Sequence, residues 1–135
     1  MRQSQGVLIV TLVTVACSRT ESAPSWQELK ELVRSEEATL REINRLVHNG
    51  VPQDDTRLLA LCRKVGAQYC HDGESWRHKE WVFYRLASRF SASGGITTDM
   101  VWVPPTEKKK AIAREGDSRR TWEHLDGSWW ILTTR

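Results

Sequence analysis

The sequence feature that most constrains the fold is an uncharged, Val-rich stretch at residues 7–16. Arg2 is the only charged residue before it, and Cys17 follows it directly. The stretch has about ten residues, within the range of about seven to fifteen for the core of an export signal. A transmembrane helix needs ~20 residues. We therefore expect residues 1–16 to be an export signal peptide and the folded part of the protein to lie after it.

The part after the signal has the size and composition of one folded domain. About 120 residues remain, and we expect 17–24 to be a short polar tether and 25–135 a single domain. A hydrophobic content of 39% with seven tryptophans indicates a folded chain. The net charge of +3 includes Arg2, which cleavage would remove. A nearly neutral mature protein predicts no nucleic-acid partner.

The residues that end the signal resemble a known motif. Thr14-Val15-Ala16-Cys17 resembles the lipobox of bacterial lipoproteins, in which small residues precede a cysteine that is acylated before cleavage. The resemblance implies a lipid on Cys17 and a place on the bacterial outer membrane or in the periplasm. Ordinary cleavage near Ala16 or Cys17 would instead leave a soluble secreted protein, and the composition also fits a secreted protein of a eukaryote.

The chain has three cysteines, and in an exported protein an odd number leaves one thiol to explain. If Cys17 carries lipid, Cys62 and Cys70 remain, and an oxidising compartment allows them to form a disulfide. The same two cysteines cluster with His71 and His78, but their spacing matches no closed zinc pattern. We therefore predict a disulfide between Cys62 and Cys70 and no metal site.

Hydrophobic periodicity predicts a first helix over residues 25–48. Ser25 and Glu28 have the spacing of a capping box, and Gly50 supplies the left-handed residue that commonly ends a helix. A straight helix of this length would reach ~36 Å, which is long for a small domain. A break near Ser35 is therefore an alternative to one continuous helix.

Two further helices are expected before residue 91. The second covers 55–66 and is capped by Asp54 or Asp55. The third covers 74–90, because four apolar residues there follow one helical stripe: Trp76, Phe83, Ala87 and Phe90.

The last forty or so residues change to a strand-like pattern, and we expect strands within 98–134. Met100–Val103 forms one short strand, 108–114 is a second candidate, and Asp126-Gly127 between two apolar runs indicates a hairpin. The chain is therefore expected to be an α+β domain. Three N-terminal helices would precede a small three- to four-stranded antiparallel meander with one face packed on the helices.

Residues that could carry catalysis are few and lack supporting motifs. Glu74 and His78 lie four apart on the predicted third helix, a spacing that ordinary helix surfaces share. Alternation along a strand places Glu123 and His124 on opposite faces. A nucleophile elbow of the Gly-x-Ser-x-Gly type and a Gly-rich phosphate loop are both missing from the sequence. We predict no catalytic residue and no cofactor, and favour a function other than an enzyme.

A binding surface is the better-supported prediction. Adjacent strand residues point to opposite faces, so Trp129 and Trp130 cannot both enter one core. An exposed tryptophan indicates a contact surface. We therefore predict that an envelope protein or a surface polymer binds to the aromatic residues of the sheet: Trp102, Trp122, Trp129 and Trp130.

The last hairpin offers an alternative. Helices followed by antiparallel strands that end in Asp126-Gly127-x-Trp129-x-Ile131-Leu132 resemble the nuclear-transport-factor-like family. The resemblance implies a small cone-shaped fold with a pocket that holds a ligand or catalyses a reaction.

Overall fold

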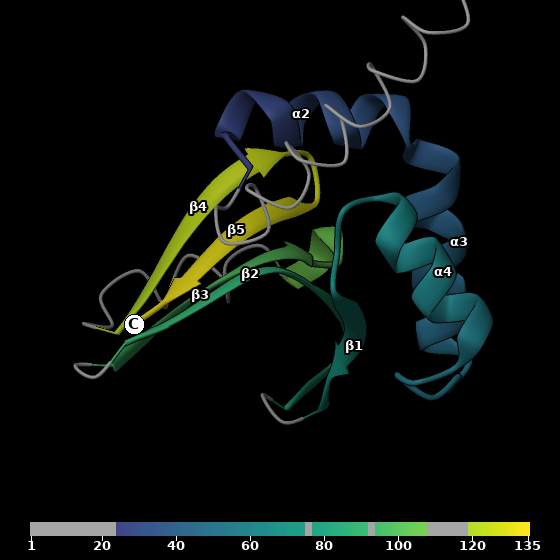
Figure 1. Ribbon diagram of the computed structural model, residues 1–135. Helices are drawn as coiled ribbons and strands as arrows, with labels where there is room; N and C mark the ends of the chain where they lie inside the picture. Colours follow the sequence, from purple (N-terminus) through teal and green to yellow (C-terminus); the bar gives the residue numbers. More distant parts are fainter. Residues whose placement is uncertain (1–23, 75–76, 92–93, 108–118) are drawn as a thin grey trace, which may run out of the picture.

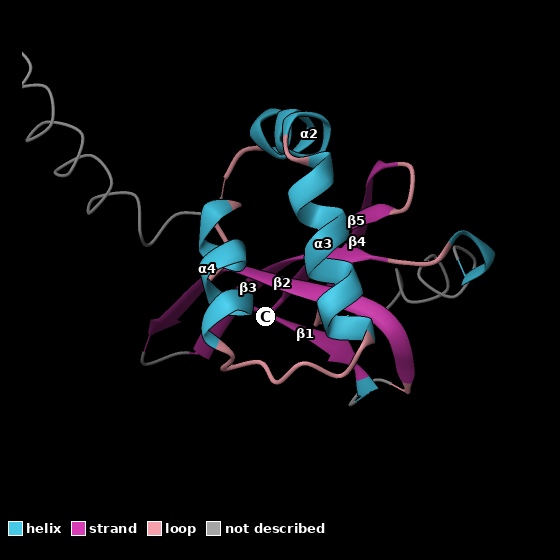
Figure 2. Cartoon of the chain, turned by 90° about the vertical axis from the view of Figure 1, so that its right-hand side faces the viewer, coloured by secondary structure: helices cyan, strands magenta, loops and turns pink. Residues whose placement is uncertain are grey.

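The structure is a computed structural model that describes residues 24–74, 77–91, 94–107 and 119–135. Three α-helices precede a five-stranded antiparallel sheet in these residues, which confirms the α+β class (Figure 1). The helices lie together on one side of the sheet (Figure 2). In chain order the elements are α2 (Trp26–Ser35), α3 (Glu37–His48), α4 (Thr56–Lys64), β1 (Tyr69–Gly73), β2 (His78–Ser91), β3 (Gly94–Trp102), the 3-10 turn η2 (Pro105–Glu107), β4 (Arg120–Asp126) and β5 (Trp129–Thr134).

The helix expected over residues 25–48 is two helices, α2 and α3, so the alternative break near Ser35 is confirmed. Glu36 leaves helical geometry between them, with φ −110° and ψ 26°. A straight helix of ~36 Å has a single direction, so its two halves could not pack on different elements at different angles. The break allows α2 to contact β4 while α3 contacts α4, β1 and β2 (Figure 1).

The helix ends follow the sequence signals. The Ser25 hydroxyl accepts a bond from the Glu28 amide at 3.2 Å, and the Asp55 carboxylate accepts one from the Leu58 amide at 3.0 Å. Gly50 follows α3 with φ +80°. Glycine enters this left-handed region without the steric cost that other residues bear. Local chemistry therefore accounts for where these helices begin and end.

The third expected helix, over 74–90, is wrong: residues 78–91 are the strand β2. Trp81 and Phe83 are buried on one face of β2, and Val82 and Tyr84 are buried on the other. A strand buried on both faces has a continuous apolar run instead of an alternating one, so some of its residues also fit a helical stripe. Trp76 of the predicted stripe lies outside the described residues.

The expected three- to four-stranded meander is also wrong, because the sheet has the order β1-β2-β3-β5-β4. The last strand lies between β3 and β4, and the candidate strand at 108–114 lies outside the described residues. Burial explains the exchange. In β5, Trp130, Ile131 and Leu132 are all buried, which suits a central strand, whereas β4 has only two buried residues, Trp122 and Leu125, as suits an edge strand.

The predicted hairpin is present, with a shifted turn. Asp126 pairs with Trp129, so the two turn residues are Gly127 and Ser128. Gly127 has φ +54°, and a positive φ at the first turn position is the pattern of a type II′ turn.

Buried side chains form a cluster on each face of the sheet. The larger cluster lies between the sheet and the helices and includes Leu40, Ile43, Leu58, Tyr84 and Met100. The second lies on the opposite face and consists of Trp81, Phe83, Val101, Val103, Trp122, Trp130 and Leu132.

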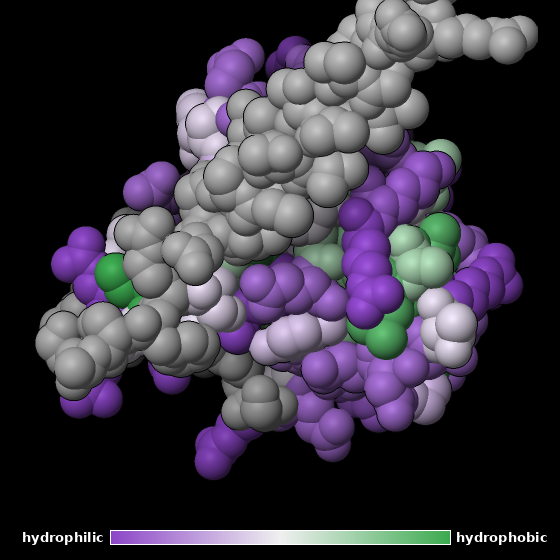
Figure 3. Space-filling view, viewed as in Figure 1, coloured by the Kyte–Doolittle hydropathy of each residue, from purple (hydrophilic) through white to green (hydrophobic). Residues whose placement is uncertain are grey.

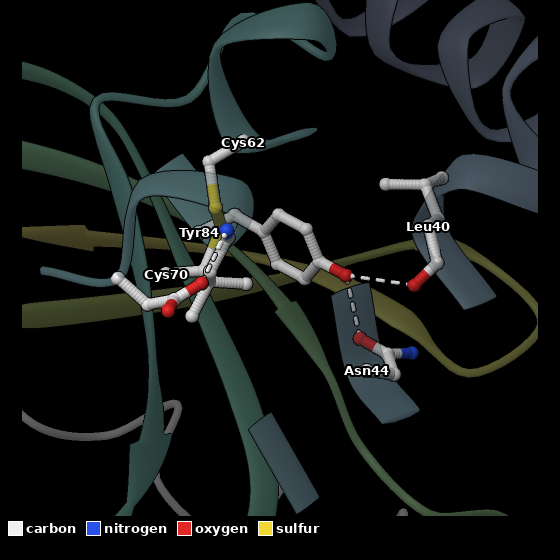
Figure 4. Close-up of a disulfide and its surroundings, with 7 residues drawn as sticks. Leu40, Asn44, Cys62, Cys70 and Tyr84 are labelled. Atoms are coloured by element: carbon white, nitrogen blue, oxygen red, sulfur yellow. Dashed lines mark hydrogen bonds between the residues drawn. A yellow bond between two sulfur atoms is a disulfide. The ribbon is translucent and has the colours of Figure 1, made fainter. Parts of the chain in front are cut away.

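The two cysteines predicted to pair lie side by side (Figure 4). Cys62 belongs to α4 and Cys70 to β1, with their Cα atoms 6.4 Å apart and both side chains fully buried. This separation is within the range of disulfides and agrees with the expected bond. The bond would connect the last helix to the first strand of the sheet.

Candidate functional site

The four tryptophans of the predicted binding surface divide between the two faces of the sheet. Trp102 pairs with Trp129 across β3 and β5, and both are half-buried at the edge of the core that faces the helices. Trp122 and Trp130 lie in the opposite cluster and are only 2% and 3% exposed. A single surface made of all four residues is therefore absent, and the pair Trp102 and Trp129 is the part that a partner can reach.

This pair lines a groove, which we call the tryptophan groove. It lies between α2 and α3 on one side and the end of β3 with the β4–β5 turn on the other, and has a volume of about 740 Å³. Its lining consists of Val33, Arg34, Glu37, Leu40, Arg41, Asn44, Arg45, His48, Asn49, Trp102, Asp126, Gly127, Ser128 and Trp129.

A second hollow of about 630 Å³ adjoins the groove. The two share His48, Asn49 and Trp102, and the second continues along Lys79 and Glu80 of β2. On the face that Figure 3 shows, hydrophilic side chains dominate the visible described surface, and apolar side chains form small separate patches. The apolar part of the groove's lining comes from Val33, Leu40, Trp102 and Trp129.

Both tryptophans of the groove are held by aromatic neighbours. Trp129 contacts Tyr84 edge to face with ring centroids 5.4 Å apart, and Trp102 contacts His48 in the same manner at 5.5 Å. His48 Nε2 lies 2.7 Å from the backbone oxygen of Glu80. Because a carbonyl oxygen only accepts, Nε2 is the donor of this bond.

Asn44 supplies a polar atom at the base of the groove. Its side chain is only 9% exposed, and its Oδ1 lies 2.5 Å from the Tyr84 hydroxyl, which is also 3.1 Å from the Leu40 carbonyl (Figure 4). Burial raises the pKa of Tyr84 well above its usual value, so this hydroxyl keeps its proton. In either orientation of the Asn44 amide, one of its polar atoms has no partner among the described residues.

Charged side chains of both signs surround the tryptophans. Arg41 pairs with Glu37 at 2.7 Å within the groove, and Arg45 pairs with Glu42 beside it. Hydrogen bonding to Arg45 lowers the pKa of Glu42. Arg34 of α2 and Asp126 of β4 also line the groove, and neither has an ion pair among the described residues.

The other candidates from the sequence lie apart from the groove or have structural contacts. His71 stacks on Phe83, and His78 stacks on Trp81. Nε2 of His124 lies 2.9 Å from the Gly127 carbonyl oxygen. Glu74 and His78 are not on a common helix, because β2 begins at residue 78. Over the described ranges there is no group of three or more His, Cys, Asp or Glu residues placed to hold a metal ion.

The structure also contains a partly buried ion pair that no sequence pattern predicts. Arg85 Nε lies 2.6 Å from Asp99 Oδ1 across β2 and β3, on the face away from the helices. Asp99 is only 3% exposed. Burial raises the pKa of this carboxyl, and the bond from Arg85 partly opposes the increase. Asp99 occupies a position in β3 where a local pattern predicts only alternation, so the sequence carries no signal for the pair.

Comparison with known proteins adds no family. No protein-family model matches the chain, and no curated protein or solved structure is significantly similar to it. None of the described helices is long and apolar enough to cross a membrane. Cys17 lies outside the described residues, so the expected lipidation remains a prediction.

Proposed function

We propose that this protein is an exported binding module, anchored by a lipid on Cys17 to a bacterial envelope, and that it holds an envelope protein or a surface polymer in the tryptophan groove. The observation that carries the proposal is the half-buried pair formed by Trp102 and Trp129 inside a groove of about 740 Å³.

The contrast among the sheet tryptophans supports this use of the pair. Trp81, Trp122 and Trp130 are at most 3% exposed, so the fold has the means to bury tryptophans fully. Trp102 and Trp129 keep part of their surface open beside charged and amide side chains. Tryptophan and arginine in a concave, partly dry setting are the residues that most often dominate binding energy.

The export part of the proposal rests on the sequence. The apolar stretch at residues 7–16 and the lipobox-like end at Cys17 support secretion with a lipid. The placement of Cys62 and Cys70 at disulfide distance is compatible with an oxidising compartment.

The test compares groove variants with a matched tryptophan outside the groove. We would immobilise the mature protein, Trp102→Ala, Trp129→Ala and Trp26→Ala, and expose each to solubilised envelope and to surface polymer of the source organism. Trp26 is 44% exposed on α2 and does not line the groove. Recovery of a saturable partner should fall about fivefold or more with the groove variants and stay unchanged with Trp26→Ala. Equal recovery with folded groove variants would overturn the assignment.

Small-ligand binding is a second candidate, because about 740 Å³ lies in the range of small-molecule sites. The space between the sheet and the helices is filled by the larger cluster, so this site is at the rim and not inside a cone. Its test is a thermal-shift screen of metabolites with the mature protein. A ligand that raises the Tm of the native protein and of Trp26→Ala, but not of Trp129→Ala, would favour this function.

A further inference from the structure

The tryptophan groove and the adjoining hollow form one elongated site. They meet at His48, Asn49 and Trp102, and together extend from Arg34 on α2 to Lys79 on β2. An open site of this shape suits an extended chain better than a compact molecule, which would be enclosed on most sides.

The charges that line the site are balanced. Four positive side chains stand against four negative ones, with His48 between them: Arg34, Arg41, Arg45 and Lys79 against Glu37, Asp72, Glu80 and Asp126. A groove that selects a polyanion or an acidic peptide has an excess of positive charge. This lining has none, and it therefore favours an uncharged occupant.

The aromatic and polar groups are of the kinds that bind sugar rings. The π faces of tryptophan carry partial negative charge, and the axial C–H groups of a sugar ring carry partial positive charge, so the two surfaces attract when stacked. Trp102 and Trp129 supply such rings from paired strands. Arg34 and Asp126 have no ion pair, and one polar atom of the Asn44 amide has no partner among the described residues. These groups are therefore available as donors and acceptors for sugar hydroxyl groups.

The buried amide gives the site a fixed polar point. The Tyr84 hydroxyl bonds to Asn44 Oδ1, and Figure 4 shows the amide nitrogen on the side of the group away from this hydroxyl. The other polar atom of this amide has no partner among the described residues and belongs to a residue that lines the groove, so a ligand hydroxyl or acetamido group would bond to it. This is the second observation, beside the tryptophans, that indicates a ligand.

We infer that the elongated site binds a neutral, hydroxyl-rich glycan chain, with sugar rings on Trp102 and Trp129 and ring substituents on Asn44, Arg34 and Asp126. The inference rests on the proposed function and names the class of its partner.

The experiment titrates the mature protein with three probes and follows tryptophan fluorescence and heat. The probes are β-1,4-linked hexamers of glucose and of N-acetylglucosamine, and a sulfated hexasaccharide as the polyanion. At least one neutral hexamer should bind with saturation and more tightly than the sulfated one. Its affinity should change less than about twofold between about 50 mM and about 500 mM sodium chloride, because few ion pairs form on binding.

Variants then place the binding in the groove. Trp129→Ala should weaken neutral-hexamer binding about tenfold or more, and Trp26→Ala should leave it unchanged. Because Trp129 also contacts Tyr84, Arg34→Ala serves as a variant without a core contact, with the exposed Arg63→Ala on α4 as its control. Arg34→Ala should weaken binding about threefold or more, and Arg63→Ala should not.

The outcomes separate this inference from the proposed function. If no neutral hexamer binds, or the sulfated probe binds more tightly, while an envelope protein is still recovered through Trp129, the glycan inference is wrong and the binding module stands. If neutral hexamers bind equally well to all variants, the site is elsewhere. If neither a glycan nor a protein depends on Trp129, both proposals are wrong.

Discussion

At the scale of single residues, Tyr84 connects the core to the candidate site. Its ring belongs to the larger buried cluster and contacts Trp129, while its hydroxyl lies within bonding distance of Asn44 and of the Leu40 carbonyl. A buried hydroxyl is tolerated only where it is bonded. Tyr84 therefore positions both an aromatic and a polar member of the groove.

Tyr84→Phe should lower the free energy of unfolding by about 1 to 2 kcal/mol, because it leaves a buried polar partner unsatisfied. Urea unfolding of the mature protein measures the loss. Tyr69→Phe is the matched control, since the half-buried Tyr69 packs its ring against Arg85, a contact that phenylalanine retains. Equal stability of the two variants would show that the Tyr84 hydroxyl bonds contribute nothing.

Asp99 makes stability depend on pH. Its pKa is raised from 3.8 in the folded protein, chiefly by burial, so between pH 3.8 and the folded pKa the folded state retains a proton that the unfolded chain releases. The folded state then binds more protons than the unfolded state, and this share of the unfolding free energy is full below pH 3.8 and decreases as pH rises through the folded pKa.

The measurement for Asp99 is urea unfolding of the native protein and of Asp99→Asn at several values between about pH 4 and about pH 7. The free energy of unfolding of the native protein minus that of the variant should decrease with increasing pH. A difference that stays constant or increases over this interval would contradict the direction of the shift. The ¹³C titration of the Asp99 carboxyl gives its pKa directly.

At the scale of elements, local signals predicted the helix ends correctly, whereas the hydrophobic period of the longest strand, β2, wrongly predicted a helix. Caps at Ser25 and Asp55 and the glycine after α3 act within one turn of the chain, so they can be read from neighbouring residues. The strand β2 is buried on both faces because the sheet has a core on each side. The cluster on the face away from the helices joins residues of strands that are distant in sequence, so no local pattern predicts it.

The expected disulfide would link two elements, α4 and β1, that are adjacent in the chain and in the fold. Cys62→Ala with Cys70→Ala should lower the free energy of unfolding by about 2 to 3 kcal/mol, because the unfolded chain regains the freedom of a short closed loop. Urea unfolding gives the value, and the native protein in strong reductant should show a similar loss. If both cysteines are alkylated after the protein without substitutions is denatured in the absence of reductant, the bond is disproved.

At the scale of the whole molecule, the proposed lipid on Cys17 would hold the protein at the membrane, and the expected tether at residues 17–24 would lie between this anchor and the folded domain. In a bacterial host, the full chain should fractionate with membranes, and Cys17→Ser should release it, since loss of the acyl chains removes the anchor. The intact mass should begin at Cys17 with an added diacylglycerol group. Cys62→Ser is the control for the loss of a cysteine, and release of both variants, or of neither, would contradict the anchor.

For the candidate site, the sequence predicted that tryptophans of the sheet form a binding surface, but not which of them share a face of the sheet. Strand alternation correctly separates Trp129 from Trp130, whereas the pairing of Trp102 with Trp129 depends on β5 lying beside β3. The residues that α3 contributes, Asn44 and His48, read locally as ordinary members of an amphipathic helix. Only the packing of α3 on the sheet brings them beside the tryptophans.

The sequence by itself determined the α+β class, the helix ends, the hairpin near Gly127 and the two cysteines that come together. These features depend on interactions between residues close in the chain, where backbone sterics and side-chain hydrogen bonds decide the conformation. The tertiary structure decided the strand identity of β2, the order β1-β2-β3-β5-β4 and the groove. These depend on which faces are buried, and burial arises from contacts between segments that only the folded chain brings together.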